Sequence, residues 1–318
     1  MRAKIPLLLI SLLLSGCQSE RKLEETRFFM NTYVRVKAWG NRDDSLEHVM
    51  EQVFEEIARV ETLTSHFNEK SLLTGGSIDH VVASEELAGL LSQSIEISNL
   101  SNGAFDPTVY PILQVWGFYD TTENRIPTET EIGKALSLVD WKSVEVSGDR
   151  IITNGAGLDL SAIAKGYAVD RAAAVLADKG IRTALIDAGG DIRCVGRKQG
   201  NWIIGIKHPR NEGLLGTIEI IEGSVATSGD YENYFEIDGR RYHHLMDPRT
   251  GRPAAEVISA TVIAPTALQA DAWATALFVM GKQGLNTLEE IEGLEGLVVL
   301  RDMSVEKTTG FPELKAVQ

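Results

Sequence analysis

Apolar residues recur at helical spacing in several stretches of the chain. Behind Ser45, a natural N-cap, they form a stripe with i, i+3 and i+4 spacing made of Val49, Met50, Val53, Phe54, Ile57 and Val60. This spacing predicts a helix that buries one face. Cap signals predict further helices over 84–99, from Thr128 with Glu131 as a capping box, over 161–179 before Gly180, from Thr266 to Met280 before Gly281, and over 286–291.

Strand-like runs gather mainly in the second half of the chain. One run lies near the N-terminus at 32–38, and the others cover 183–188, 202–207, 217–221, 233–237, 257–264 and 296–300. Turn signals separate several of them, namely Gly189-Gly190, Gly223 and Asp238-Gly239. Clusters of strands beside clusters of helices, with no internal repeat, favour an α+β fold over a regular βαβ repeat.

The first residues have the pattern of a bacterial lipoprotein signal. Arg2 and Lys4 precede an apolar run over 5–14 that is too short to cross a bilayer, and Leu14-Ser15-Gly16-Cys17 follows. Small residues before a cysteine are typical of a cleavage site at which the cysteine thiol takes a lipid. A plain secretory signal with an incidental cysteine is the alternative.

This signal predicts how the chain is organised. Residues 1–16 are expected to be removed, Cys17 to be lipidated, 17–26 to form a polar linker, and 27–318 to form the functional domain, whose internal lobe boundary stays open. The protein would be lipid-anchored to a bacterial membrane, inner or outer, and face the periplasm or the cell exterior. Cys194 would be the one other cysteine, so no disulfide within the chain is expected.

Charge argues against one class of partner. The 318-residue chain has 45 acidic and 31 basic residues and a net charge of −14, so it is a poor partner for nucleic acid, whose affinity comes largely from neutralised phosphates. A phosphorylated ligand would have to be bound by local means, such as a metal ion, a helix N-terminus or a single basic side chain.

Two groups of polar residues are candidates for such a site. Asp159 and Ser161 lie at a predicted helix start, and Lys165 follows one turn later, within reach of a phosphate. Asp271 and Thr275 share one face of an otherwise apolar helix and suit Mg²⁺, which takes oxygen ligands. The alternatives are a capped helix with a solvated lysine, and a helix-terminal aspartate bonded to backbone.

Histidines and glycines add weaker signals. His243 and His244 precede an Asp-Pro-x-Thr-Gly turn and could supply a base near neutral pH, although a lone histidine is more often structural. The run from Gly103 to Thr108 is by itself a good turn. Gly155-Ala156-Gly157 begins like a dinucleotide fingerprint, but Leu160 stands at the third glycine position, which argues against a Rossmann site.

Taken together and in this order, the segments resemble the ApbE family of flavin transferases over residues 30–281. One motif alone would be weak, whereas the ordered set is specific. The matching motifs are Met30-x-Thr32, Ser65-x-Phe67-Asn68, Gly103-Ala104-Phe105-Asp106-Pro107-Thr108-Val109 with Trp116-Gly117-Phe118, Asp159-Leu160-x-x-Ile163-Ala164-Lys165-Gly166-Tyr167, Asp187-Ala188-Gly189-Gly190-Asp191, Ala226-Thr227-Ser228-Gly229-Asp230-Tyr231, His244-x-x-Asp247-Pro248-x-Thr250-Gly251 and Ala270-Asp271-Ala272-x-Ala274-Thr275-Ala276.

The resemblance implies an α+β, T-fold-like architecture of mixed sheets and packed helices, in which two closely joined lobes hold FAD between them. It implies FAD contacts by Met30, Phe67, Ala104, Phe105, Asp106, Asp159, Lys165 and Leu245. It also implies a Mg²⁺ site made by Asp271, Thr275 and the Ala162 carbonyl with Ala274 close by, and His244 as the catalytic base beside Asp271. Because some members have tyrosine at Phe67, this ring would stack without donating a hydrogen bond.

The activity implied by the resemblance is Mg²⁺-dependent transfer of FMN from FAD to a Thr or Ser hydroxyl of an acceptor protein, through a phosphoester bond and with release of AMP. The acceptor would be a membrane redox subunit or an extracytoplasmic flavoprotein. The alternatives are an FAD pyrophosphatase that uses water as nucleophile, a non-catalytic FAD-binding lipoprotein, and an envelope scaffold. The Asp271 and Thr275 pair argues against the non-catalytic lipoprotein, and a scaffold would leave the buried Asp271 and the His244 turn unexplained.

Overall fold

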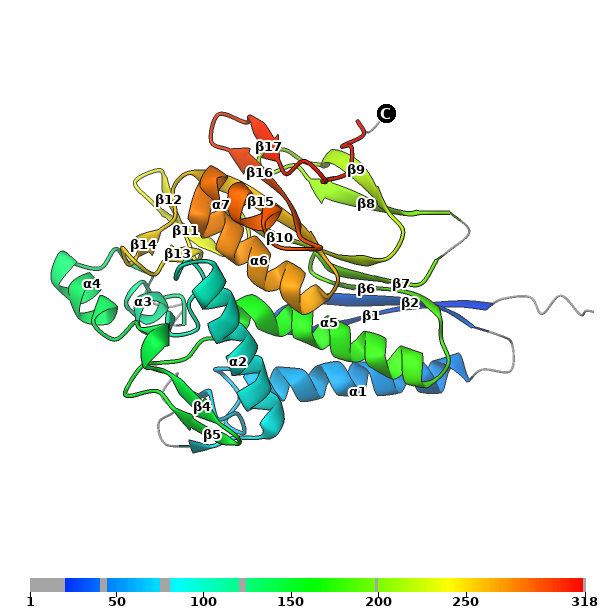
Figure 1. Ribbon diagram of the computed structural model, residues 1–318, viewed down its shortest axis with the longest axis horizontal. Coiled ribbons are helices and arrows are strands. Elements are labelled where there is room, and N and C mark those ends of the chain that lie inside the picture. Colours follow the sequence, from blue (N-terminus) through cyan, green and yellow to red (C-terminus); the bar gives the residue numbers. More distant parts are fainter. Residues whose placement is uncertain (1–20, 41–44, 75–80, 120–123, 198–199, 317–318) are drawn as a thin grey trace, which may run out of the picture.

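The centre of the protein is an eight-stranded sheet. The computed structural model describes residues 21–40, 45–74, 81–119, 124–197 and 200–316, and the strand order is β1-β2-β6-β7-β10-β15-β16-β17 (Figure 1). Neighbouring strands are antiparallel throughout this sheet. The strands are β1 Arg21–Phe29, β2 Thr32–Gly40, β6 Thr183–Ala188, β7 Asp191–Val195, β10 Gly223–Gly229, β15 Val257–Ala264, β16 Glu295–Leu300 and β17 Val305–Lys307.

Three long helices cover one face of this sheet. They are α1 (Leu46–Thr64), α5 (Ser161–Asp178) and α6 (Ala267–Met280), and Figure 1 shows them together on the same side of the strands. Because side chains alternate along a strand, Val34 and Val36 of β2 point to the helices and pack in one core with Val53 of α1 and Val169 of α5. The sheet therefore holds α5 and α6 at fixed positions.

The opposite face carries a hairpin of β8 (Trp202–Lys207) and β9 (Leu214–Ile220). Its burial alternates along β8: Trp202, Ile204 and Ile206 pack in a second core with residues of the large sheet. Ile203, between them, is 68% exposed. The hairpin is thus fixed by one apolar side and leaves its other side to solvent.

Smaller elements gather at one end of the molecule, at the left of Figure 1. The helices among these smaller elements are α2 (Glu85–Leu100), α3 (Tyr110–Val115) and α4 (Glu129–Leu136). The short helix α7 (Gly284–Glu289) follows α6 in the chain. Two 3-10 turns lie at Trp141–Ser143 and Gly281–Gln283. The small strands are β3 (Val81–Val82), β4 (Glu145–Ser147) and β5 (Arg150–Ile152) in one sheet, and the hairpins β11 (Tyr234–Ile237) with β12 (Arg240–His243) and β13 (Met246–Asp247) with β14 (Arg252–Pro253).

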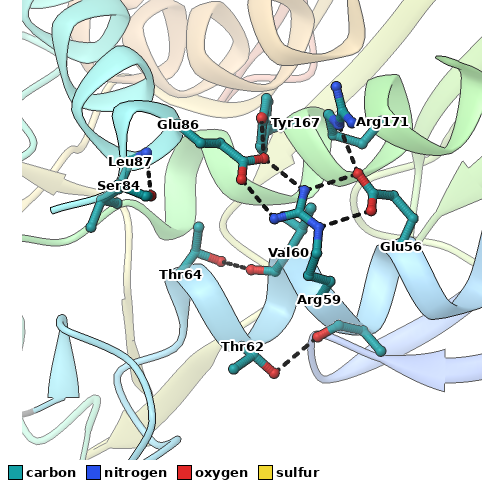
Figure 2. Close-up of polar contacts among 11 residues, drawn as sticks. Glu56, Arg59, Val60, Thr62, Thr64, Ser84, Glu86, Leu87, Tyr167 and Arg171 are labelled. Carbon is teal, nitrogen blue, oxygen red and sulfur yellow. Dashed lines mark hydrogen bonds and ion pairs between the residues drawn. The ribbon is translucent and has the colours of Figure 1, made fainter. Parts of the chain in front are cut away.

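A polar network joins α1, α2 and α5 (Figure 2). Arg59 of α1 donates to Glu56 at 2.8 Å and to Glu86 of α2 at 2.6 Å. From α5, Arg171 donates to the same Glu56 at 2.8 Å, and the Tyr167 hydroxyl bonds Glu86. Hydrogen bonds from Arg59, and then from Arg171, lower the pKa of Glu56 to about 2 against the effect of burial. The network fixes the flank of α5 opposite the large sheet.

The expected α+β class is confirmed, and its strands pair antiparallel because many consecutive strands are joined as hairpins. The predicted helices are present within a few residues of their expected bounds, and Thr128 with Glu131 forms the predicted capping box. Ser45 occupies the N-cap position of α1 but makes no side-chain cap bond. The strands β7, β10 and β17 were not predicted, since they are short or rich in glycine and serine.

The linker expected over 17–26 is wrong from Arg21 on, because Arg21–Phe29 form β1. β1 is an edge strand whose charged side chains are paired: Arg27 bonds Glu51 of α1 at 2.6 Å, and Glu24 lies 3.1 Å from Lys37 of β2. Polar composition is typical of an edge strand as well as of a linker. The predicted signal peptide 1–16 and Cys17 lie outside the described residues. No helix within the described ranges is both long and apolar enough to cross a membrane.

Candidate active site at the junction of α5, α6 and the central sheet

Lys165 lies in a buried cluster of charges. Its Nζ is 2.9 Å from Oδ2 of Asp191 and 3.3 Å from Oδ1 of Asp271, and each of these aspartates is 3% exposed. Burial opposes the charge on Lys165, but the two carboxylates raise its pKa above the usual range, so the ammonium stays protonated at neutral pH. Burial, followed by the charge of Asp271, raises the pKa of Asp191 to about 7.

Gly166 allows the helices that carry these groups to meet. Its N–H donates to Oδ2 of Asp271 at 2.9 Å, and a Cβ at this position would lie 2.2 Å from the carbonyl oxygen of Ala267. In an α-helix the N–H of residue i points at the carbonyl of residue i−4. The Ala162 carbonyl of α5 therefore lies next to the Asp271 carboxylate of α6.

Thr275 follows Asp271 by one helical turn. Its Oγ1 lies 3.2 Å from Oγ of Ser228 in β10, and the neighbouring Ala274 is 1% exposed. The structure thus brings Ala162, Asp271, Ala274 and Thr275 to one place. The alternative of an Asp271 bonded to backbone is met in part, since Asp271 accepts from the Gly166 N–H, but Asp271 also contacts Lys165.

Two turns of the central sheet meet next to this cluster. The β1–β2 turn places Met30 and Asn31 in the left-handed region, with φ of 50° and 58°, and the Met30 N–H donates to Glu61 of α1 at 2.7 Å. A Cβ on Gly189 of the β6–β7 turn would lie 2.3 Å from Oγ1 of Thr32. The close contact of these turns puts Met30 near the strand that begins with Asp191.

His244 has the geometry of an unprotonated base. Its Nδ1 lies 3.0 Å from the carbonyl oxygen of Asn233, so Nδ1 carries the hydrogen and Nε2 keeps a free lone pair. Burial lowers the pKa of His244 to about 4, and the positive charge of Lys165 contributes to the shift. The adjacent Leu245 is 5% exposed and belongs to the largest apolar core.

Asp159 is satisfied within the protein. Its Oδ1 accepts from the Ser161 N–H at 2.6 Å, its Oδ2 accepts from the Tyr119 hydroxyl, and His66 Nε2 lies 3.4 Å from Oδ1. Burial opposes ionisation, but these partners, His66 foremost, hold the pKa of Asp159 at about 2. Asp159 therefore fixes the start of α5 together with an aromatic cluster.

That aromatic cluster consists of His66, Phe67, Tyr110 and Tyr119. The rings of Tyr110 and Tyr119 stack with centroids 4.5 Å apart, and His66 meets Tyr119 edge-on at 5.1 Å. Phe67 lies at the rim, 5.9 Å from Tyr119, and is 74% exposed. Its exposed ring offers a flat surface for stacking with a planar ligand.

The segment of Ala104, Phe105 and Asp106 lies against the start of α5, where the Asp159 N–H donates to the Pro107 carbonyl at 2.7 Å. Asp106 Oδ1 accepts from the N–H and the hydroxyl of Thr108 at 2.8 and 2.6 Å. Burial raises the pKa of Asp106 to about 6. Ala104 and Phe105 are 1% and 2% exposed, so any ligand would meet the backbone there rather than their side chains.

The residues that sequence reasoning missed are those whose partners are far away in the chain. Asp191 ends the motif Asp187-Ala188-Gly189-Gly190-Asp191, but its spacing in the chain does not indicate that it shares Lys165 with Asp271. Glu232 is another: it lies near the cluster, and its charge acts on Lys165. His66 and Tyr119 adjoin the motif residues Phe67 and Phe118, so an aromatic residue next to a motif phenylalanine is the sequence signal for both.

The donors at the cluster fit a hard cation. Within the part of the chain that the structure describes, no group of three or more His, Cys, Asp or Glu side chains could hold a metal ion. The available donors are instead the carboxylates of Asp191 and Asp271, the Thr275 hydroxyl and the Ala162 carbonyl. Oδ2 of Asp191 is buried, and its one partner among the described residues is the ammonium of Lys165 at 2.9 Å. Such a set suits Mg²⁺, which binds few protein oxygens and keeps water or phosphate as further ligands.

The chain is similar to known proteins over most of its length. The model of the ApbE family matches residues 30–298. An FAD:protein FMN transferase of Salmonella typhimurium is 34% identical over 73% of this chain and 70% of its own, and one of Treponema pallidum is 31% identical over 92% and 88%. A crystal structure of the ApbE protein of Thermotoga maritima has a TM-score of 0.86 at 36% identity and covers 91% of this chain and 97% of its own. The flavin transferase ApbE of Vibrio cholerae has a TM-score of 0.82 at 26% identity and covers 92% and 98%.

Proposed function

The chain belongs to the ApbE family of flavin transferases, and on this premise we propose that it moves FMN from FAD to a Thr or Ser hydroxyl of an acceptor protein in a Mg²⁺-dependent reaction that releases AMP. The observation that carries this proposal is the sharing of one ammonium, that of Lys165, by two buried carboxylates. Elsewhere in the site, His244 supplies a base, and the residues around Phe67 supply a rim for the flavin.

The charge at the cluster explains why a cation is needed. With Asp191 and Asp271 ionised, two negative charges face the single positive charge of Lys165, which leaves −1 at the centre. FAD brings a pyrophosphate with two further negative charges, and like charges repel strongly in a buried site. A divalent cation changes the local charge from −1 to +1. It also binds in competition with protons at Asp191, whose pKa is raised to about 7.

Asp271, Thr275 and the Ala162 carbonyl would hold the Mg²⁺, with Asp191 as a fourth oxygen donor and Ala274 packed beside them. The bound cation supplies neutralisation of the charge that develops on the pyrophosphate as a P–O bond breaks. Lys165 adds a fixed positive charge, and the Asp159 contacts position the start of α5 beside it.

His244 acts on the acceptor. Its free Nε2 takes the proton of the acceptor hydroxyl, whose oxygen then forms a bond to the FMN phosphorus. The bond from that phosphorus to the bridging oxygen breaks, and AMP leaves with the electron pair. The products are a phosphoester of FMN with the acceptor, AMP and a proton on His244. With a pKa of about 4, His244 is neutral at pH 7 and able to accept this proton.

FAD would bind across the rim formed by Met30, Phe67, Leu245 and the backbone of Ala104, Phe105 and Asp106, between the small elements and the central sheet. Phe67 stacks on one of its rings, since it is exposed at the edge of the aromatic cluster.

The lipoprotein signal supports the further proposal that Cys17 is lipidated and that the enzyme faces the periplasm or the cell exterior.

The test uses the purified chain with FAD, with and without Mg²⁺, in the presence or absence of an acceptor. The acceptor is the flavin-free form of a protein known to carry FMN on a threonine phosphoester. Flavin fluorescence on the denatured acceptor, matched by AMP and seen only with Mg²⁺, supports the proposal. AMP and FMN without a labelled acceptor would indicate an FAD pyrophosphatase. FAD that stays bound and unchanged in every sample would contradict catalysis.

A further inference from the structure

The strand β8 has an unpaired edge. Within the described residues it pairs with β9 alone. The far side of β9 is closed by the C-terminal segment, where Thr217 and Lys315 exchange two backbone hydrogen bonds of 2.8 Å. Alternate residues of β8 consequently direct their N–H and C=O groups away from β9, where they can pair with another extended chain.

A groove runs along this edge. It has a volume of about 470 Å³, and every residue from Ile203 to Lys207 lines it. The opposite wall is the exposed face of the central sheet, with Arg35 and Lys37 of β2 and Asp187 of β6. Six residues of an extended strand measure about 20 Å, so the groove along β8 accepts a segment of roughly that length.

One end of the groove reaches the active site. Gly189 and Gly190 line it, and they form the turn directly before Asp191, which pairs with Lys165. Glu232 also lines it. Burial raises the pKa of this carboxyl, and the charges of Lys165 and Asp271 also act on it. A chain in the groove therefore ends beside the cluster to which the reacting hydroxyl must come.

The groove also has an unusual charge for this protein. Its lining holds the cations Arg35, Lys37 and Lys207 and the anions Asp187 and Glu232, which gives +1 (three minus two), whereas the chain as a whole has −14. Arg35 pairs with Asp187 at 2.8 Å and Lys37 with Glu24 at 3.1 Å, so Lys207 is the lining cation most open to a new partner. The Lys207 ammonium lies 4.7 Å from the Tyr231 ring centroid at the groove wall. An extended segment with acidic side chains would be attracted here and repelled from most of the remaining surface.

We propose that the acceptor protein presents its Thr or Ser in an extended segment that pairs with the free edge of β8 and passes Lys207 toward Asp191. Backbone hydrogen bonds to β8 supply affinity that depends little on sequence, and Lys207 favours an acidic neighbour of the reacting residue. This proposal rests on the transferase function proposed above and adds how the acceptor is bound.

The first test separates acceptor binding from FAD chemistry. In Ile203→Asp and Lys207→Glu, exposed or groove-lining side chains of β8 become negative without any change at Lys165, Asp271 or His244. We expect each variant to raise the KM for the acceptor at least about fivefold, as for an important interface residue, with the Kd for FAD unchanged. Ile221→Asp is the matched control, because Ile221 is 54% exposed just after β9 and does not line the groove.

A second test reads the pairing itself. Hydrogen exchange of the backbone amides in 202–207 should slow when the acceptor is added to the full chain with FAD, while the amides of β9 change little. Protection of β8 that grows with enzyme concentration and needs no acceptor would show that a second copy of the chain occupies the edge, and would overturn the proposal.

The outcomes distinguish this inference from the proposed function. A wild-type chain that never labels the acceptor contradicts the transferase function. A wild-type chain that labels it, with Ile203→Asp and Lys207→Glu indistinguishable from Ile221→Asp in KM, leaves the transferase intact and overturns the β8 docking site.

Discussion

The substitution Gly166→Ala tests whether the close approach of α5 and α6 builds the site. The added Cβ would lie 2.2 Å from the Ala267 carbonyl oxygen, 2.6 Å from its carbon and 2.8 Å from Cβ of Asp271. Ordinary contact needs a separation larger by roughly 1 Å. Neither neighbour is the flexible end of a side chain, so the two helices must move apart.

The magnitude follows from three contributions. Overpacking of a well-packed contact costs about 1–3 kcal/mol. Separation of the helices weakens the 2.9 Å hydrogen bond from the Gly166 N–H to Asp271, and a bond to a charged group contributes about 1.5–3 kcal/mol. Alanine returns about 1 kcal/mol through its higher helix propensity. The free energy of unfolding should therefore fall by about 1.5–5 kcal/mol.

Guanidinium unfolding measures this change through the midpoint at constant slope. Gly89 in α2 and Gly133 in α4 are matched controls, because a Cβ at either position would meet nothing within 4 Å. Their alanine variants should be more stable by about 0.5–1 kcal/mol. If Gly166→Ala were as stable as these controls, the tight contact between α5 and α6 would not exist as described. If it were unstable but kept full Mg²⁺-dependent activity, the contact would not position Asp271 for metal binding.

Three further substitutions test titratable side chains: Asp271 and His244 of the site, and His243, which precedes His244 in the chain. Asp271→Asn keeps the shape of the side chain and a hydrogen-bond acceptor for Gly166 but removes one negative charge. The rate of AMP release should therefore fall about 100-fold or more and lose its Mg²⁺ dependence. A fully active variant would contradict the metal assignment. His244→Asn should slow transfer by about 10²–10⁴-fold with an unchanged Kd for FAD, and a normal single-turnover rate would remove this base from the mechanism. Burial lowers the pKa of His243 to about 4 from an ordinary 6.5, so the unfolded chain binds more protons between these values and stability is lost as pH falls through them. His243→Asn should therefore lose about 2 kcal/mol less than wild type between pH 7 and 5 in denaturant unfolding, and equal losses would refute the assignment.

The local features of the fold could be predicted because their causes lie close together in the chain. The capping box of Thr128 and Glu131 depends on four consecutive residues and is present. The apolar stripe of α1 and the end of α6 at Gly281, with φ of 70°, are equally local. The charged residues of β1 predict a linker, because they gain their partners, Glu51 and Lys37, only when the chain has folded.

The charge of the active site, like the pairing of β1, depends on residues that are far apart in the chain. From the sequence, Lys165 is a free cation one turn into a helix and, with the helix-start amides, an added electrophile beside a metal held by Asp271 and Thr275. In the structure the ammonium is already shared by Asp191 and Asp271, which come from segments 26 and 106 residues further along the chain. Because two carboxylates outweigh it, Lys165 cannot by itself hold a dianionic pyrophosphate. The proposed role of a divalent cation therefore has more support from the structure's charges than from the sequence, because the contacts that pair Lys165 exist only in the folded protein.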